Sequence, residues 1–234
     1  LNKSFIVRRS LKGRELLQGL TLLSEYMQHC IEQHSHVWIA QREGRAKNGI
    51  DKTEAALLKM LAMYQRKKPL SESLGKLHIV PVSISYEYDA CDVLKAEELY
   101  QIETTGAFTK TEKSDIESIV AGMIGYKGAV HVAFGTEIQY ESDDPDVIAA
   151  SIDKQILANY KLRDSNFIAL EILKDEGLLP EGVAELDIAI PVIAEQSREV
   201  FMNRYKQVDS RLHRHYLLSY ANPVISYYRM QSLA

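Results

Sequence analysis

The apolar run Val37 to Ala40 constrains the fold more than any other feature, because it leads directly into a loop crowded with cations. Such a short, fully apolar run is typical of a strand that needs cover on both faces. Strands of this kind occur in α/β sheets with helices on each side. We therefore expect Val37 to Ala40 to form a buried strand, with the following loop at the carboxyl edge of a sheet, where open α/β folds place their ligands.

The loop at residues 41–49 has the composition of an anion site. Gly44 and Gly49 would allow the backbone to approach a bound group closely. Cationic side chains of the loop suit a phosphate or a carboxylate because they supply charge and hydrogen-bond donors. These cations are Arg42, Arg45 and Lys47.

The remaining sequence alternates between strand-like and helix-like patterns. Strand-like stretches occupy residues 5–7, 77–85 and 129–134, and helix-like stretches occupy residues 10–34, 55–63, 92–99 and 112–124. Helical patterns dominate from Asp144 and Pro145 onward. The predicted fold class is α/β, a mixed sheet flanked by helices with a helical C-terminal extension. We place the α/β core at residues 1–140 and the extension at residues 141–234.

Charge is distributed unevenly along the 234 residues. Residues 1–76 carry 14 Lys and Arg against 7 Asp and Glu, a net charge of +7, whereas the remainder carries a net charge of −11. The first third is therefore expected to meet phosphates or an anionic membrane face. Nucleic-acid binding is disfavoured because the whole chain is acidic and its basic residues are not interleaved with aromatics. No apolar run approaches the roughly 18 residues of a spanning helix.

Two clusters have metal-ligand chemistry, and each also has a structural interpretation. His29, Cys30, His34 and His36 lack a recognised zinc spacing and lie at an expected helix end, where histidine is favourable. The carboxylates of Glu87, Asp89 and Asp92 could bind Mg²⁺, but Asp92 also suits the cap of a helix. We favour the structural interpretation of both clusters and expect no metal and no cofactor.

Three segments on predicted strand ends, residues 2–8, 42–45 and 79–82, resemble in this order the second, third and fourth sequence blocks of the glycerolipid acyltransferases, in a bacterial branch. The resemblance implies that Arg8, two positions after the Phe5-Ile6 pair, contacts the acceptor phosphate. It implies substrate-binding roles for the third block and for the proline of the fourth block. With Lys47 of the same loop, the implied substrate-binding residues are Arg8, Glu43, Gly44, Arg45, Lys47 and Pro81.

The resemblance also implies an O-acyltransferase whose histidine base, oriented by an aspartate five positions later, removes a proton from a glycerol hydroxyl. None of the seven histidines has Asp at that offset, so no catalytic residue is assigned here and the dyad is expected upstream of Leu1. The implied donor is acyl-CoA or acyl-carrier protein, and the acceptor is glycerol-3-phosphate or a lysophosphatidate-like ester. The implied location is cytoplasmic, peripheral to the inner membrane.

Structural interpretations of some of these residues, and two other functions, stay open beside this one. Pro81 could simply shape a strand, and the stripe Ala55 to Met63 could be core packing or an acyl-chain groove. A phospholipid-binding relative without catalysis would suit the missing dyad. An unrelated phosphate-ester enzyme would use Glu87, Asp89 and Asp92 with a metal.

Overall fold

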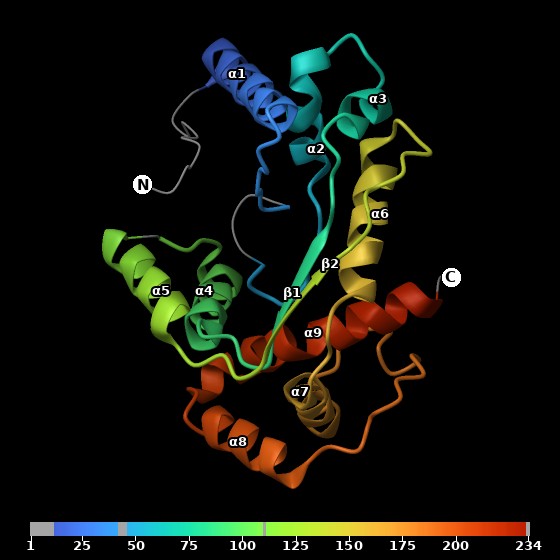
Figure 1. Cartoon of the computed structure of the whole chain (residues 1–234). Coiled ribbons are helices and arrows are strands. Elements are labelled where there is room, and N and C mark those ends of the chain that lie inside the picture. The colour runs from blue at the N-terminus through green and yellow to red at the C-terminus, as the bar shows by residue number, and fades with distance from the viewer. Residues whose placement is uncertain (1–11, 42–45, 110, 233–234) are drawn as a thin grey trace. The chain divides into compact units, whose positions relative to one another are not determined.

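The computed structural model describes residues 12–41, 46–109 and 111–232 (Figure 1). The chain divides into two compact units. Unit 1 comprises Leu1–Arg45, Lys52–Pro81 and Gly135–Gln155, and unit 2 comprises Ala46–Asp51, Val82–Phe134 and Ile156–Ala234. Both units draw residues from both sides of residue 140. The proposed division at that point stays a prediction.

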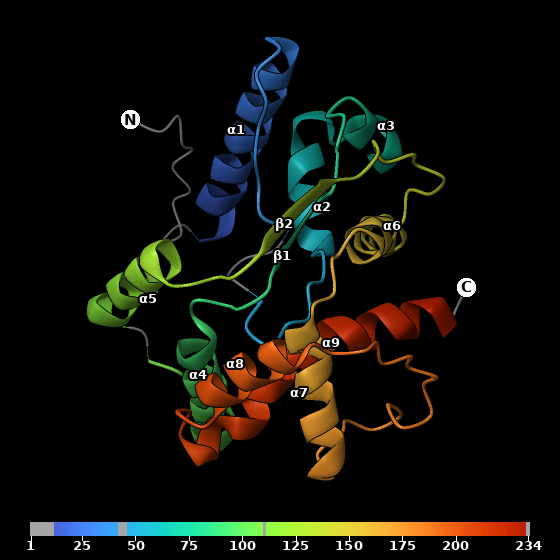
Figure 2. The ribbon, with the colours of Figure 1, turned by 60° about the horizontal axis from the view of Figure 1, so that its bottom comes forward.

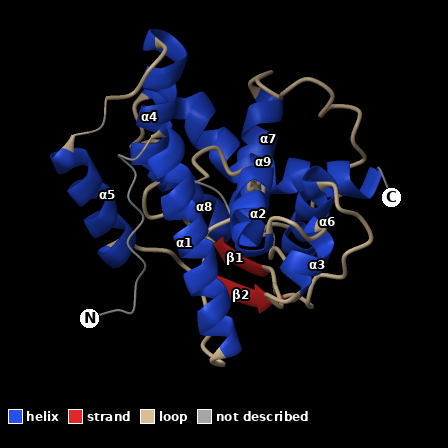
Figure 3. Cartoon of the chain, turned by 90° about the horizontal axis from the view of Figure 1, so that it is seen from above, coloured by secondary structure: helices blue, strands red, loops and turns tan. Residues whose placement is uncertain are grey.

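Helices make up most of the described residues, and a small sheet accompanies them (Figure 3). The sheet consists of two antiparallel strands, β1 (Val82–Tyr86) and β2 (Val130–Phe134), with Ile84 opposite Val132. The α/β class is therefore confirmed only in the coarse sense that helices and a sheet occur together with a helical C-terminal part. Of the other predicted strands, residues 5–7 lie outside the described residues.

The prediction of a buried strand at Val37 to Ala40 is wrong. These residues have no regular secondary structure, and the side chains of Trp38 and Ile39 are 65% and 42% exposed. A strand is stable only when a second strand satisfies its backbone groups. Among the residues that the structure describes, the only paired strands are β1 and β2, so this apolar run has no such partner.

Unit 1 is built mainly from α1 (Gly13–Glu32), α2 (Ala55–Leu61) with the 3₁₀ turn η1 (Ala62–Gln65), and α3 (Leu70–Gly75). It also contains most of α6 (Pro145–Ala158). Its core includes the fully buried Leu58 and Leu74. The Ser24 hydroxyl joins α1 to the next layer, since it donates to the Leu61 carbonyl at 2.6 Å and accepts from the Tyr64 N–H at 3.0 Å.

The stripe Ala55 to Met63 therefore serves as core. Leu58, Leu61 and Ala62 are all buried in unit 1. Side chains that already fill a packed interior leave no open channel for an acyl chain along this face. The structural interpretation of the stripe is the one that these residues support.

Unit 2 contains five helices in its described residues (Figure 2). They are α4 (Asp92–Thr105), α5 (Glu112–Ile124), α7 (Asp164–Asp175), α8 (Glu195–Tyr205) and α9 (His213–Ser232), the last preceded by the 3₁₀ turn η2 (Ser210–Leu212). The predicted helix at residues 112–124 and its end at Gly125 are confirmed. Helix α7 packs on α9, where the Asn166 side-chain amide donates to the Tyr220 carbonyl at 2.9 Å.

The β1–β2 ribbon of unit 2 buries polar side chains on one face and exposes apolar side chains on the other. Its inner face carries the buried Ser83 and Ser85, while Val130, Val132 and Phe134 on the outer face are about half exposed or more. The Ser85 hydroxyl accepts from the Lys161 N–H at 3.3 Å, which satisfies one of the buried polar groups.

Candidate functional site

Four of the predicted substrate-binding residues, Arg8, Glu43, Gly44 and Arg45, lie outside the described residues. The structure therefore places only Lys47 and Pro81 of that set. We call residues 42–47 the cationic segment. The surroundings of Lys47 and Pro81, together with the residues on either side of the cationic segment, are what the structure shows of the predicted anion site.

Lys47 forms an ion pair within unit 2. Its Nζ lies 2.5 Å from Oε1 of Glu98 on α4, and both side chains are largely withdrawn from water. The Glu98 carboxylate already neutralises this cation. An anionic ligand at Lys47 would have to share the ammonium group with Glu98 or replace it.

The two residues after Lys47 are fastened to α9. The Asn48 carbonyl accepts from the Asn222 side-chain amide at 2.6 Å. Gly49 has φ +74°, and a Cβ at its position would lie 2.1 Å from the Ser219 carbonyl oxygen. Pro223 has no N–H, so the helix hydrogen bond to the Ser219 carbonyl is missing. The backbone of Gly49 lies against α9 at this point.

Gly49 was predicted to let the backbone approach a ligand, but the group it approaches is the protein's own helix. The result is a fixed end for the cationic segment within unit 2. On the other side of that segment, in unit 1, the Gln41 carbonyl accepts from the Glu54 N–H at the start of α2 at 3.0 Å.

Pro81 is buried and immediately precedes β1. Its carbonyl accepts from the Gly135 N–H at 2.8 Å. This contact fits a proline that shapes the start of a strand, which is the structural interpretation that the sequence also allowed.

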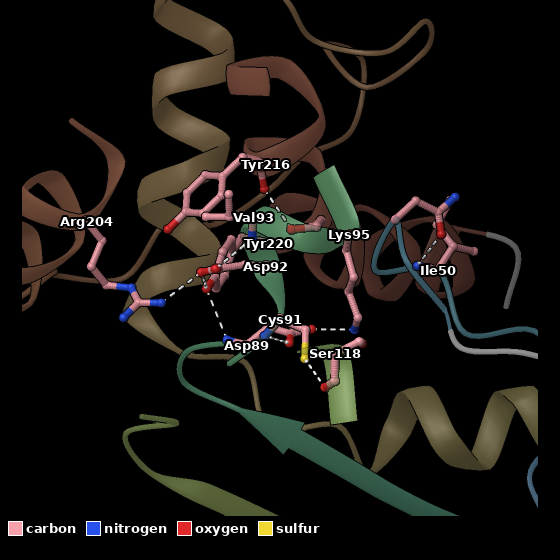
Figure 4. A network of polar contacts seen from close by, with 12 residues as sticks. Ile50, Asp89, Cys91, Asp92, Val93, Lys95, Ser118, Arg204, Tyr216 and Tyr220 are labelled. Atoms are coloured by element: carbon pink, nitrogen blue, oxygen red, sulfur yellow. Dashed lines mark hydrogen bonds and ion pairs between the residues drawn. The ribbon is translucent and has the colours of Figure 1, made fainter. Parts of the chain in front are cut away.

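A buried carboxylate in unit 2 lies at the centre of a network of polar contacts (Figure 4). Asp92 is 5% exposed at the start of α4. Its Oδ2 accepts from the Tyr220 hydroxyl at 2.7 Å and from Arg204 Nη2 at 2.9 Å, and its Oδ1 accepts from the Val93 N–H at 2.8 Å. The network joins α4, α8 and α9. We call these three side chains, Asp92, Arg204 and Tyr220, the Asp92 network.

Asp92 raises the pKa of both of its side-chain partners in the network. Burial opposes the charged form of Arg204, but the hydrogen bond and negative charge of Asp92 outweigh it and raise the Arg204 pKa. Burial, followed by the Asp92 charge, raises the pKa of Tyr220 well above its ordinary value. The phenol therefore stays protonated and donates to the carboxylate. The guanidinium also lies 5.0 Å from the centre of the Tyr88 ring.

Contacts with protein donors leave the carboxylates of Glu87, Asp89 and Asp92 little capacity to coordinate Mg²⁺. Asp89 accepts from the Cys91 N–H at 2.7 Å and pairs with Lys95, while Glu87 Oε2 accepts from the Ala129 N–H at 2.8 Å. Protein donors thus occupy each of the three carboxylates considered as ligands. Across the described ranges, no group of three or more His, Cys, Asp or Glu residues is arranged to hold a metal ion.

Two imidazole–carboxylate pairs were not predicted. His78 Nδ1 lies 2.9 Å from Glu137 Oε1 in unit 1, and His215 Nε2 lies 2.7 Å from Glu103 Oε2 in unit 2. A carboxylate can orient a histidine base, but these partners are 59 and 112 positions apart and do not match the acyltransferase offset. No local sequence signal indicates either pair.

Within the described ranges, no helix combines the length and apolar composition that crossing a bilayer requires. Comparison of the chain with known protein families, with curated proteins and with solved structures finds no match.

Proposed function

We propose that the chain carries the acceptor-binding part of a glycerolipid O-acyltransferase. In this proposal a fatty acyl group moves from acyl-CoA or acyl-carrier protein to a hydroxyl of glycerol-3-phosphate or its monoacyl ester. The observation that carries the proposal is the order of three sequence blocks, residues 2–8, 42–45 and 79–82. Each block alone is weak, and their order together is specific.

The structure contributes support from the surroundings of the third block. A loop that holds a phosphate needs fixed ends, because a freely moving loop must be ordered when the ligand binds. Asn48 and Gly49 are fixed on α9, and Gln41 is hydrogen-bonded at the start of α2. Both flanks of the cationic segment are therefore held within their own units.

The proposed mechanism uses general-base catalysis. A histidine oriented by an aspartate, neither of them assigned to a residue of this chain, removes the proton of the acceptor hydroxyl, and the resulting oxygen nucleophile attacks the thioester carbonyl. The thiol of the donor leaves. In the proposal, Arg8 and Arg45 hold the acceptor phosphate and so place its hydroxyl, and Lys47 takes part by sharing its ammonium group between Glu98 and the phosphate.

A non-catalytic phospholipid-binding relative is the second candidate, because no histidine of this chain has Asp five positions later. It would keep the acceptor site and lack the base. The metal-dependent phosphate-ester enzyme is less well supported, since its proposed carboxylate ligands accept hydrogen bonds from the protein itself.

The test is acyl transfer from a labelled acyl thioester to 1-acyl-glycerol-3-phosphate, measured for this chain and for a version extended upstream to its start codon. We expect activity only in the extended version. In that version, Arg8→Ala should raise the KM for the acceptor about tenfold or more and leave the KM for the donor nearly unchanged. Arg9→Ala is the matched control and should change neither.

Inactivity of both versions, with 1-acyl-glycerol-3-phosphate still bound in an equilibrium titration, would replace the enzyme with the non-catalytic relative. Equal effects of Arg8→Ala on both substrates would remove Arg8 from the phosphate site. Hydrolysis of a phosphomonoester that requires added Mg²⁺, without acyl transfer, would favour the phosphate-ester enzyme.

A further inference from the structure

Helix α5 lies at the outside of unit 2 and presents an apolar stripe to solvent (Figure 1). Residues three, four, seven and eight positions after Ile116 share one face of the helix with it. Each of these positions carries a large apolar side chain, and the five side chains are 45–80% exposed. We call the set the α5 stripe, which consists of Ile116, Ile119, Val120, Met123 and Ile124.

The opposite face of α5 meets the rest of unit 2, and it carries small residues. The Ser118 carbonyl accepts from the Cys91 thiol at 3.4 Å, and a Cβ on Gly122 would lie 3.7 Å from the Cys91 sulfur. At the end of the helix, a Cβ on Gly125 would lie 2.7 Å from the Ala90 Cβ. The helix therefore packs on unit 2 through its small residues, while its large apolar residues stay outside.

The α5 stripe is large enough to form a protein interface. At their exposed fractions the five side chains together present roughly 600 Å² of surface, which is the upper end of the largest apolar patch on a typical monomer. A standard interface buries about 800 Å² on each partner. The stripe therefore supplies most of the area that a stable protein complex needs.

Charges beside the α5 stripe disfavour an anionic occupant. Asp115 and Glu117 lie about 100° to either side of Ile116 around the helix. Phosphates of a nucleic acid or of an anionic bilayer would approach these two carboxylates and be repelled. The occupant is therefore an apolar protein surface whose own charges avoid the two acidic edges.

A second copy of α5 meets this requirement when the two helices run antiparallel. Val120 is near the midpoint of the α5 stripe, so a two-fold axis beside it covers the stripe of one copy with the whole stripe of the other. Because a helix rises about 1.5 Å per residue, Glu117 is then displaced by about 9 Å along the axis from Glu117 of the second copy. The two Asp115 residues are displaced by about 15 Å. Salt screens exposed charges over about 8 Å, so the like charges repel each other only weakly.

We propose that the α5 stripe is the interface of a homodimer, in which α5 packs antiparallel on α5 of a second copy. The same residues on both copies leave the water, so the contact is closed and does not lead to larger assemblies. The proposal is independent of the acyltransferase function, because it uses none of the residues placed at the acceptor.

The experiment is sedimentation equilibrium of the full chain between about 1 and 100 μM, because an interface of this size is expected to have a micromolar dissociation constant. The mass should rise from 26.6 kDa towards twice that value. Ile119→Ser with Met123→Ser should raise the dissociation constant at least about 100-fold, since each copy loses two buried apolar side chains.

The matched control is Val132→Ser with Phe134→Ser on the outer face of the β1–β2 ribbon. These two side chains are 48% and 70% exposed, close to the values of 56% and 76% for Ile119 and Met123. The control should leave the dissociation constant within about twofold, because its side chains lie outside the proposed interface. Unchanged circular dichroism at the lowest concentration verifies that both variants fold.

Cross-linking tests the antiparallel orientation. Ile116→Cys and Ile124→Cys are prepared as separate chains in a Cys30→Ser background, with the buried Cys91 retained. In the antiparallel dimer, position 116 lies level with position 124 of the second copy, whereas like positions are about 12 Å apart along the axis. A bismaleimide about 8 Å long, near the usual spacing of packed helices, should therefore link the mixed pair in preference to either like pair.

A parent chain that stays monomeric up to about 100 μM would overturn the proposal. A dimer that weakens equally in the two serine variants, or only in the control, would also overturn it and would place the contact elsewhere, in the second case at the β1–β2 ribbon. Preferred linkage of like positions would refute the antiparallel packing. None of these outcomes depends on acyl transfer, so the test is separate from that of the proposed function.

Discussion

Asp92 in unit 2 and Asp153 in unit 1 show two ways of withdrawing a carboxylate from water. Asp92 is buried against the guanidinium of Arg204 and the hydroxyl of Tyr220. Asp153 is half-buried, and its Oδ1 accepts from the N–H of Thr53 at 2.8 Å and from the Thr53 hydroxyl at 2.6 Å. One carboxylate has a cation as its hydrogen-bonding partner, and the other has a threonine with no net charge.

The difference explains how deep each carboxylate lies. Burial raises the pKa of Asp153, and the Thr53 hydrogen bonds with the charge of Lys52 only partly oppose it. Neutral dipoles thus offset part of the cost of burying a charge. A full opposite charge permits nearly complete burial of Asp92, and it leaves the fold dependent on Arg204, because without the guanidinium Asp92 would be an unpaired buried charge.

The largest effect should come from removing the carboxylate of the Asp92 network. Asp92→Ala leaves the buried Tyr220 hydroxyl and the partly exposed Arg204 guanidinium without their acceptor, so we expect the free energy of unfolding to fall by about 2–4 kcal/mol in urea denaturation. The double variant Asp92→Ala with Arg204→Met should recover much of this loss because it removes both charges. A loss below about 1 kcal/mol in the single variant would mean that water satisfies both donors once the carboxylate is gone, and the comparison with Asp153 would fail.

A smaller effect is expected when only the neutral donor of the Asp92 network is removed. Tyr220→Phe deletes the hydrogen bond to Asp92 and the acceptor of the Asp89 N–H, which lies 3.0 Å from the hydroxyl. Hydrogen bonds to a charged group contribute about 1.5–3 kcal/mol, and we expect a loss in that range by the same urea measurement. Thr53→Ala provides the matched case in unit 1. A larger loss for Thr53→Ala than for Tyr220→Phe would reverse the ranking of the two sites.

Sequence reasoning succeeded where the signal is local. The helix at Glu112–Ile124 could be predicted with its bounds because its apolar spacing and the glycine that ends it lie within a few residues of each other. The start of α6 at Pro145 follows from Asp144, whose carboxylate accepts from the Asp146 N–H at 2.8 Å. Caps and stripes of this kind are properties of short segments.

The same reasoning failed where the outcome depends on distant residues. The run Val37 to Ala40 has strand-like composition, but composition cannot supply a neighbouring strand. Asp92 was recognised as a helix start or metal ligand, whereas its partners Arg204 and Tyr220 lie 112 and 128 positions away. The role of Lys47 at a phosphate stays a prediction, but the sequence could not identify its Glu98 partner, which is 51 positions away. Sequence patterns identify the charged residues, but only the fold determines which partner each of them contacts.

The smallest effect, and the one with a distinct pH signature, concerns Asp153. Asp153→Asn keeps an oxygen that accepts from Thr53 and removes the charge, so at pH 7 the variant should be as stable as the parent protein or up to about 1 kcal/mol more stable. The folded pKa of Asp153 lies above its ordinary value of 3.8. The folded state therefore binds the proton more tightly than the unfolded state, and the parent gains stability as the pH falls through that raised value.

The advantage of Asp153→Asn should accordingly shrink as the pH falls from 7 and become constant below about 3.8, the ordinary value of the carboxyl. Urea denaturation of both proteins across this range measures the difference directly. An advantage that grows as the pH falls would mean that the folded pKa is lowered, as expected for a carboxylate whose dominant partner is a cation. The contribution of burial to the pKa of Asp153 would then be refuted, and the contrast with the cation-paired Asp92 would lose its electrostatic basis.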